Sequence, residues 1–121
     1  MIKDFTEMSV WQKAMDIAEK CFNISESLPK KEDYALTSQL RRSAESISAN
    51  IAEGFGRRTT KDKSRFYDIS RGSAFETKSH LIYGNRVKYF SENECLEIQN
   101  LIGEVIHDLN KITSRLNTIQ P

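Results

Sequence analysis

The sequence predicts an all-α protein that folds as an antiparallel up-down four-helix bundle. Only two prolines, Pro29 and Pro121, occur in 121 residues, so helices can run far without interruption. Apolar residues recur at helical spacing in four separate segments. The connections between these segments are short, which favours neighbouring helices that run in opposite directions. We expect one domain over residues 1–121, because a chain of this length has room for a single core.

The first helix is expected from about Ser9 to Leu28. Ser9 is an acceptable N-cap, and Pro29 prevents a further turn. Two adjacent apolar lines follow this segment: Trp11, Met15, Ala18 and Phe22, and beside them Val10, Ile17, Cys21, Ile24 and Leu28. Together they cover about half of the helix circumference, which is more than one packing partner needs.

The second helix is expected to begin after an N-cap at Asp33 and to end near Gly54, where Gly54 and Gly56 can take the left-handed geometry that closes a helix. Its apolar stripe consists of Leu36, Leu40, Ala44, Ile47 and Ile51. Beside this stripe runs a line of small or amide side chains: Gln39, Ser43, Ser46 and Asn50. Buried side chains of this kind need hydrogen-bond partners, and small ones let a neighbouring helix approach closely. We therefore expect this helix to be enclosed by protein.

The third helix is expected from about Lys61 to Tyr89, after an N-cap at Thr60. Its predicted core side is traced by Phe66, Ile69, Ser73, His80, Tyr83 and Val87. Phe75 and Ile82 lie one heptad apart on roughly the opposite side, so they are candidate oligomer-interface residues. Gly72 and Gly84 each cost about 1 kcal/mol relative to Ala inside a helix, which indicates close backbone contact or a slight bend.

The fourth helix opens with the clearest cap in the chain. Ser91 to Glu94 match the S-x-x-E capping box, in which the Ser and Glu side chains each accept a backbone N–H. A sustained apolar stripe follows: Leu101, Ile102, Val105, Ile106, Leu109, Ile112 and Leu116.

Composition narrows the function classes. Lys and Arg total 18 against 17 Asp and Glu, a net charge of +1, which argues against nonspecific nucleic-acid binding by overall charge. No apolar run reaches about 18 residues, and the first residues lack the apolar core of a secretory signal, so we expect a cytoplasmic protein that makes no membrane contact. Cys21 and Cys95 lack CxxC spacing and are expected to be reduced, partly buried thiols.

A local basic cluster is the main functional candidate. It consists of Arg57, Arg58, Lys61, Lys63 and Arg65, opposed only by Asp62. Phe55, Phe66 and Tyr67 lie nearby and offer rings on which bases could stack, so the five cations are candidate nucleic-acid-binding residues. The alternative is a solvated loop. Cations at the start of a helix oppose its dipole, so an anionic partner or another compensating group is expected.

A structural polar layer is predicted between the second and third helices, formed by Arg41, Ser43, Asn50 and Glu76. A buried carboxylate needs a hydrogen-bonded or charged partner, so we expect Glu76 to pair with Arg41, Ser43 or Asn50. The alternative is an acid–base pair of Glu76 with His80, one turn away.

No catalytic, cofactor or metal site is predicted. Glu104 and His107 form an E-x-x-H pair, but helical geometry places His107 nearly opposite the apolar stripe, and a second E-x-x-H is missing. No nucleophile triad can be assembled from two histidines. The glycines at 54 and 56 follow a helix and lack a downstream Gly-Lys-Ser, so they mark a helix end and no phosphate loop.

Three segments carry a family resemblance: VWQKAMD at 10–16, LTSQLRRSAESISANIAEG at 36–54 and RFYDISRGSAFE at 65–76. They resemble the S23-type four-helix-bundle proteins encoded in intervening sequences of bacterial 23S rRNA genes, a family sometimes labelled a ribosomal protein. The resemblance implies a bundle that assembles into a ring, typically a pentamer. It also implies a distant relationship to the accessory variability protein of diversity-generating retroelements, a basic ring that works with a reverse transcriptase. The family has no settled biochemical activity.

Two departures from the family pattern are visible. Ser48 occupies a position where a proline is expected, and Ala74 with Phe75 stand where aliphatic and acidic residues are more usual. The second departure affects a candidate interface.

These observations lead to one main hypothesis: a non-enzymatic, self-assembling helical-bundle protein that associates with RNA or with a nucleic-acid-processing protein. The first alternative is a structural or adaptor module that does not bind nucleic acid. The second is a small enzyme built on Glu76 and His80, or on a metal held by Glu104 and His107.

Overall fold

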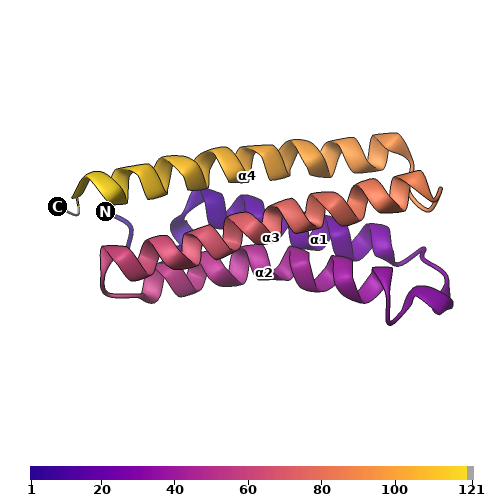
Figure 1. The fold of residues 1–121 in the computed structure, drawn as a ribbon, viewed down its shortest axis with the longest axis horizontal. Coiled ribbons are helices and arrows are strands. Elements are labelled where there is room, and N and C mark those ends of the chain that lie inside the picture. The colour runs from indigo at the N-terminus through magenta and orange to yellow at the C-terminus, as the bar shows by residue number, and fades with distance from the viewer. Residues whose placement is uncertain (120–121) are drawn as a thin grey trace.

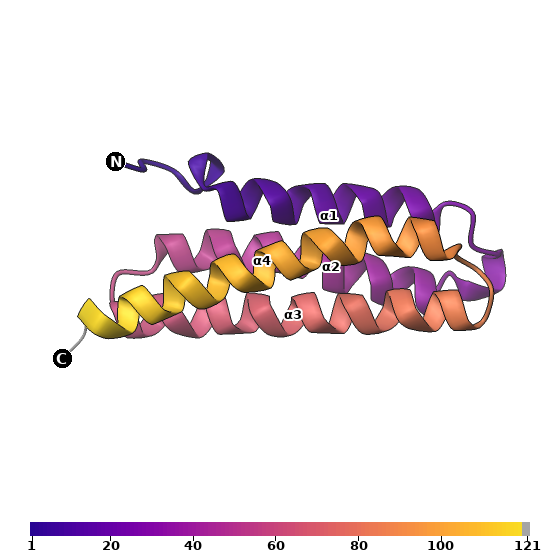
Figure 2. The same ribbon diagram turned by 90° about the horizontal axis from the view of Figure 1, so that it is seen from above.

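The computed structural model describes residues 1–119 and confirms the all-α four-helix bundle (Figure 1). The long helices are α1 (Ser9–Ser25), α2 (Leu36–Gly56), α3 (Thr60–Arg86) and α4 (Glu92–Ile119), and the described residues form no strand. Two short 3-10 turns, η1 (Phe5–Glu7) and η2 (Lys30–Glu32), precede α1 and α2. Consecutive helices run in opposite directions, so the N-terminal segment, the α2–α3 connection and the end of α4 lie at one end of the bundle (Figures 1 and 2).

The first two helices begin or end differently from the expected boundaries. α1 stops at Ser25, three residues before Leu28, and Met8 occupies its N-cap position in place of Ser9. α2 begins at Leu36 because the preceding segment forms η2, and the carboxylate of Glu32 accepts the N–H of Leu36 at 3.3 Å. The prediction of Asp33 as N-cap was therefore wrong.

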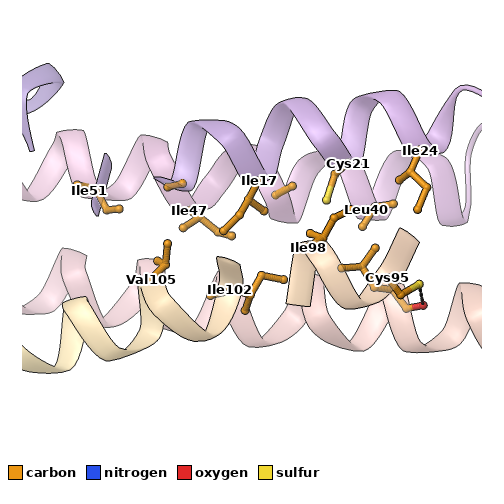
Figure 3. Close-up of a cluster of buried hydrophobic side chains, with 14 of the residues drawn as sticks. Ile17, Cys21, Ile24, Leu40, Ile47, Ile51, Cys95, Ile98, Ile102 and Val105 are labelled. Atoms are coloured by element: carbon orange, nitrogen blue, oxygen red, sulfur yellow. Dashed lines mark hydrogen bonds between the residues drawn. The ribbon is translucent and has the colours of Figure 1, made fainter. Parts of the chain in front are cut away.

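The core lies along the bundle axis and draws on all four helices (Figure 3). Figure 3 shows Ile17 of α1, Ile47 of α2 and Ile102 of α4 pointing into the same interior, and each is fully buried. Every residue of the predicted α2 stripe is buried. Cys21 and Cys95 are buried free thiols, and the Cys95 thiol donates to the Leu81 carbonyl at 3.5 Å. Burial, with a smaller contribution from Cys95, raises the pKa of Cys21 to about 12.

The predicted core side of α3 was wrong by about one position along the helix. The buried residues are Tyr67, Ser70, Ala74, Thr77, Leu81 and Gly84. Ile69, Tyr83 and Val87, which were expected inside, are 42%, 52% and 41% exposed. The buried stripe contains mostly small or polar side chains, so a search for large apolar residues selects the flank of this helix.

Small residues allow α2 and α3 to pack closely and to form a hydrogen-bonded seam. Thr77 Oγ1 donates to Ser43 Oγ at 3.0 Å or to the Ser73 carbonyl at 2.8 Å, and Ser70 Oγ donates to the Ile47 carbonyl at 2.8 Å. Ser46 and Ser73 share a hydrogen bond of 2.9 Å between their hydroxyls. The seam satisfies hydroxyls that would otherwise be costly to bury.

The α3–α4 turn closes α3 three residues before the expected end. Lys88 takes a left-handed backbone with φ 73°, while the N–H of Tyr89 bonds the Gly84 carbonyl at 2.8 Å and that of Lys88 bonds the Asn85 carbonyl at 3.0 Å. These two bonds define a Schellman cap. The capping box of α4 is confirmed, because Ser91 N–H donates to Glu94 Oε1 at 2.9 Å and Glu94 N–H donates to Ser91 Oγ at 3.2 Å. None of the described helices combines the length and apolar character needed to cross a lipid bilayer.

Candidate functional site

The basic cluster forms the α2–α3 corner, which we define as residues 53–66. α2 ends at Gly56, and α3 begins at Thr60 after an N-cap at Thr59, one residue earlier than predicted. Thr59 Oγ1 accepts the backbone N–H of Asp62 at 3.0 Å. Asp62 places a carboxylate in the first turn of α3, where its negative charge is attracted by the positive end of the helix dipole.

Two of the five cations in the α2–α3 corner surround one aromatic ring. The guanidinium carbons of Arg57 and Arg65 lie 4.5 and 4.4 Å from the ring centroid of Phe66. Arg57 also forms ion pairs with Glu53 at 2.9 Å and Asp62 at 3.9 Å, and Arg65 pairs with Asp62 at 3.7 Å. Both arginines are therefore paired with carboxylates of the corner, and their guanidinium groups cover the Phe66 ring.

A third cation closes the end of α2. The ammonium of Lys63 donates to the carbonyls of Phe55 at 2.7 Å and Gly54 at 3.4 Å, and it lies 5.6 Å from the Phe55 ring centroid. The last carbonyls of a helix carry its negative partial charge and favour a cation. Lys63 lies in the first turn of α3, but its ammonium neutralises the carbonyl end of α2. This contact compensates for a cation near the start of α3.

Arg58 and Lys61 are the two remaining cations, and both are exposed. Within residues 1–119 neither has a carboxylate within ion-pair distance. The rings expected to stack on bases are occupied: Phe66 and Phe55 contact cations, and Tyr67 is only 4% exposed. The α2–α3 corner can therefore attract phosphate through two cations, while its aromatic residues serve the fold.

The predicted polar layer is only partly assembled. Ser43 lies in the α2–α3 seam, and Asn50 Nδ2 donates to the carbonyl and hydroxyl of Ser46, each at 2.9 Å. Ser70 and Thr77, which the sequence did not single out, complete the seam from α3 together with Ser73, which was expected on the core side. Their spacing of three and four residues, in phase with Ala74 and Leu81, was the available signal.

Arg41 and Glu76 were wrongly placed in this layer. Arg41 faces α1, where its guanidinium donates to Ser25 Oγ at 2.7 Å and Glu26 Oε2 at 2.9 Å and lies 4.5 Å from the Phe22 ring centroid. Glu76 is exposed and bonds His80 at 3.2 Å, so its carboxylate keeps water contact and needs no buried partner.

The E-x-x-H pair does not form a joint site. Glu104 forms an ion pair with Lys13 at 3.3 Å, and His107 is exposed on α4. Residues 1–119 contain no group of three or more His, Cys, Asp and Glu side chains positioned to hold a metal ion.

The candidate interface residues Phe75 and Ile82 are 46% and 40% exposed on α3. The guanidinium of Arg71 lies 5.1 Å from the Phe75 ring centroid. On a helix with about 100° between residues, Ile69, Tyr83 and Val87 lie on one side of the buried stripe, and Phe75 and Ile82 lie on the other. α3 therefore carries two separate apolar flanks.

Comparison with known proteins agrees with this architecture. The chain is similar to a protein of unknown function from the S23 ribosomal protein family of Bacteroides thetaiotaomicron, with a TM-score of 0.80 and 26% sequence identity over 86% of this chain and 97% of that one. No curated protein matches the sequence. A family model described as 23S rRNA-intervening sequence protein matches residues 6–111, so the chain belongs to the 23S rRNA-intervening sequence protein family.

Proposed function

We propose that this chain is a non-enzymatic protein that assembles into a homo-oligomer and binds RNA through the α2–α3 corner. The observation that carries the proposal is the pair of unpartnered cations, Arg58 and Lys61, at an exposed corner that assembly would repeat. Two cations give a weak phosphate site in one subunit. Several copies held together multiply that site without any new contact.

The two apolar flanks of α3 support assembly. Large apolar side chains scattered singly over a surface are normal, but α3 carries five exposed ones, which fall into two groups. One flank comprises Ile69, Tyr83 and Val87, and the other comprises Phe75 and Ile82. Two different surfaces on one subunit suit a head-to-tail contact, which closes into a ring when its rotation permits. A pentamer, as the family resemblance implies, is one such ring.

The mass of the native protein tests assembly. Phe75→Glu with Ile82→Glu should lower the mass measured by light scattering to that of a monomer, while circular dichroism keeps its helical signal. Phe22→Glu is the matched control, because Phe22 is 49% exposed on α1 beside Arg41. An unmodified protein that is already monomeric contradicts assembly.

RNA binding is tested by its salt dependence. Arg58→Ala with Lys61→Ala should weaken binding of a single-stranded RNA and reduce the salt slope by roughly one unit per removed phosphate contact. Arg42→Ala, which removes an exposed cation from α2, should leave the slope unchanged. Adding Arg57→Ala should also loosen the corner, because Arg57 pairs with Glu53 and Asp62. If the unmodified protein binds no RNA at low salt, RNA binding is refuted, and the alternative of a structural or adaptor module without nucleic-acid binding remains.

The non-enzymatic part of the proposal has support from the surroundings of the candidate acid–base pair. The side chains of Glu76 and His80 are 54% and 24% exposed on the surface of α3. Acid–base catalysis draws on groups whose pKa is shifted by an enclosed, low-dielectric site. This pair lies on an open helix face, where an i, i+4 hydrogen bond between a carboxylate and a histidine is an ordinary surface contact.

A further inference from the structure

A surface recess of about 380 Å³ lies between the N-terminal segment, the first turn of α1 and the last turns of α4. It follows from unequal helix lengths, because α1 has 17 residues and α4 has 28. Figure 2 shows α4 diverging from α1 toward the end where both chain termini lie. There α1 no longer accompanies α4, and Ile2 and Met8 of the N-terminal segment line the recess together with Lys111, Ile112 and Arg115 of α4. This recess is distinct from the α2–α3 corner.

One wall of the recess is apolar. Ile2 and Met8 of the N-terminal segment, Val10 of α1 and Ile112 of α4 form it. Ile2 is 49% exposed, so part of this wall faces water. Covering that surface with an apolar group is favourable, because it removes apolar area from water.

The charged residues of the recess are mostly cations. Lys13, Lys111 and Arg115 line it with one carboxylate, Asp108, which leaves a surplus of two positive charges. Lys13 is already neutralised, because its ammonium bonds Asp108 at 3.0 Å and Glu104 at 3.3 Å. The bond to Asp108 is also the main reason why the pKa of Lys13 is raised.

The surplus charge therefore resides on Lys111 and Arg115. They lie one turn apart on α4, and both are exposed. In the described part of the chain neither meets a carboxylate within ion-pair distance. A guanidinium and an ammonium at this spacing can hold one carboxylate or phosphate, with the guanidinium able to donate two parallel hydrogen bonds.

We propose that this recess binds a small amphipathic anion, a carboxylate or phosphate joined to a short apolar chain. The head group pairs with Lys111 and Arg115, and the chain covers the wall formed by Ile2, Met8 and Ile112. The volume lies in the range of small-molecule sites, about 300 to 1,000 Å³. An anion without an apolar chain leaves the apolar wall exposed to water, and a neutral apolar molecule leaves Lys111 and Arg115 without a partner. Each of these two kinds of ligand should therefore bind more weakly.

Calorimetric titration of the full chain tests the proposal with four probes: octanoate, octyl phosphate, acetate and octanol. Octanoate or octyl phosphate should bind saturably, the stronger of the two identifying the head group, and acetate and octanol should bind at least about tenfold more weakly. In NMR spectra the bound probe should shift amide signals of the N-terminal segment and of residues 108–115. No saturable binding of either anion, or shifts confined to other residues, overturns the proposal.

Matched variants test the two parts of the site. Lys111→Gln with Arg115→Gln should weaken binding of the anion about tenfold, while Arg42→Gln with Arg86→Gln, which removes the same charge elsewhere, should not. Ile2→Asn should weaken binding without altering the helical signal, because Ile2 lies outside the core. Equal binding by the Lys111/Arg115 variant overturns the proposal. The proposal is also overturned if that variant changes its native mass but still binds the anion, because a second copy of the chain would then cover the recess.

Discussion

Two glycines of α3 should respond in opposite directions to the same substitution. A Cβ built on Gly84 lies 2.4 Å from Cδ2 and Cε2 of Phe90, whereas one built on Gly72 has no atom within 4 Å. Phe90 is only 3% exposed, and it packs in the Schellman turn that joins α3 to α4. Gly84→Ala therefore forces a buried ring to move, and Gly72→Ala does not.

The expected magnitudes follow from this geometry. Carbon atoms in contact lie about 3.5 to 4.0 Å apart, so the Phe90 ring must retreat by roughly 1 Å. Overpacking of this kind costs about 1 to 3 kcal/mol, and replacing Gly by Ala in a helix returns up to about 1 kcal/mol. We expect Gly84→Ala to lower the free energy of unfolding by about 1 to 2 kcal/mol. Gly72→Ala should raise it by about 0.5 to 1 kcal/mol.

Urea denaturation followed by far-UV circular dichroism measures both values. All variants must be compared at one protein concentration, since the proposed assembly would make apparent stability concentration-dependent. Gly103→Ala on α4 provides a second open position, because its added Cβ also has no atom within 4 Å. A Gly84→Ala protein as stable as Gly72→Ala would show that Phe90 does not press on this backbone, and the account of the turn would be wrong.

Three further predictions concern the turn, the thiols and the seam. Lys88→Gly should raise the free energy of unfolding by about 1 kcal/mol in urea titrations, because Lys88 has φ 73°; Lys88→Ala should bring no comparable gain. Burial raises the pKa of Cys21 from 9.0 to about 12, so the thiol ionises at a lower pH in the unfolded chain than in the folded one. The free energy of unfolding therefore falls as the pH rises above about 9. From about pH 8 to about pH 10 the free energy of unfolding of the unmodified protein should fall by about 1.4 kcal/mol more than that of Cys21→Ala. Equal pH dependence of the two proteins in urea titrations would refute this. Thr77→Val should cost about 1 to 2 kcal/mol in thermal unfolding, because it removes the hydroxyl that donates to the buried Ser43 Oγ; an unchanged midpoint would contradict that role.

Local patterns were enough to predict the fold class and much of the α2 stripe. The spacing of Leu36, Leu40 and Ile47 identifies a buried helix face, since helical periodicity places such residues on one side whatever the neighbours are. The capping box at Ser91 was equally readable, because both of its hydrogen bonds join residues within one turn. The exposure of Phe75 and Ile82 also followed from their angular position on α3.

Contacts between helices decided what periodicity left open. The core side of α3 depends on Ser70, Thr77 and Gly84, whose small size matters only because α2 and Phe90 approach them closely. Gly72 and Gly84 look alike in the sequence, yet only one touches a neighbour.

The same holds for the charged side chains. Glu76 was expected to pair in the interior with Arg41, Ser43 or Asn50, but Arg41 turns toward α1 and Glu76 toward water. In the α2–α3 corner, tertiary structure separates three cations that are paired within the fold from Arg58 and Lys61. A charge count along the chain cannot make that distinction, because the contacts of Lys63 with the Phe55 carbonyl and of Arg57 with the Phe66 ring depend on how α2 and α3 meet.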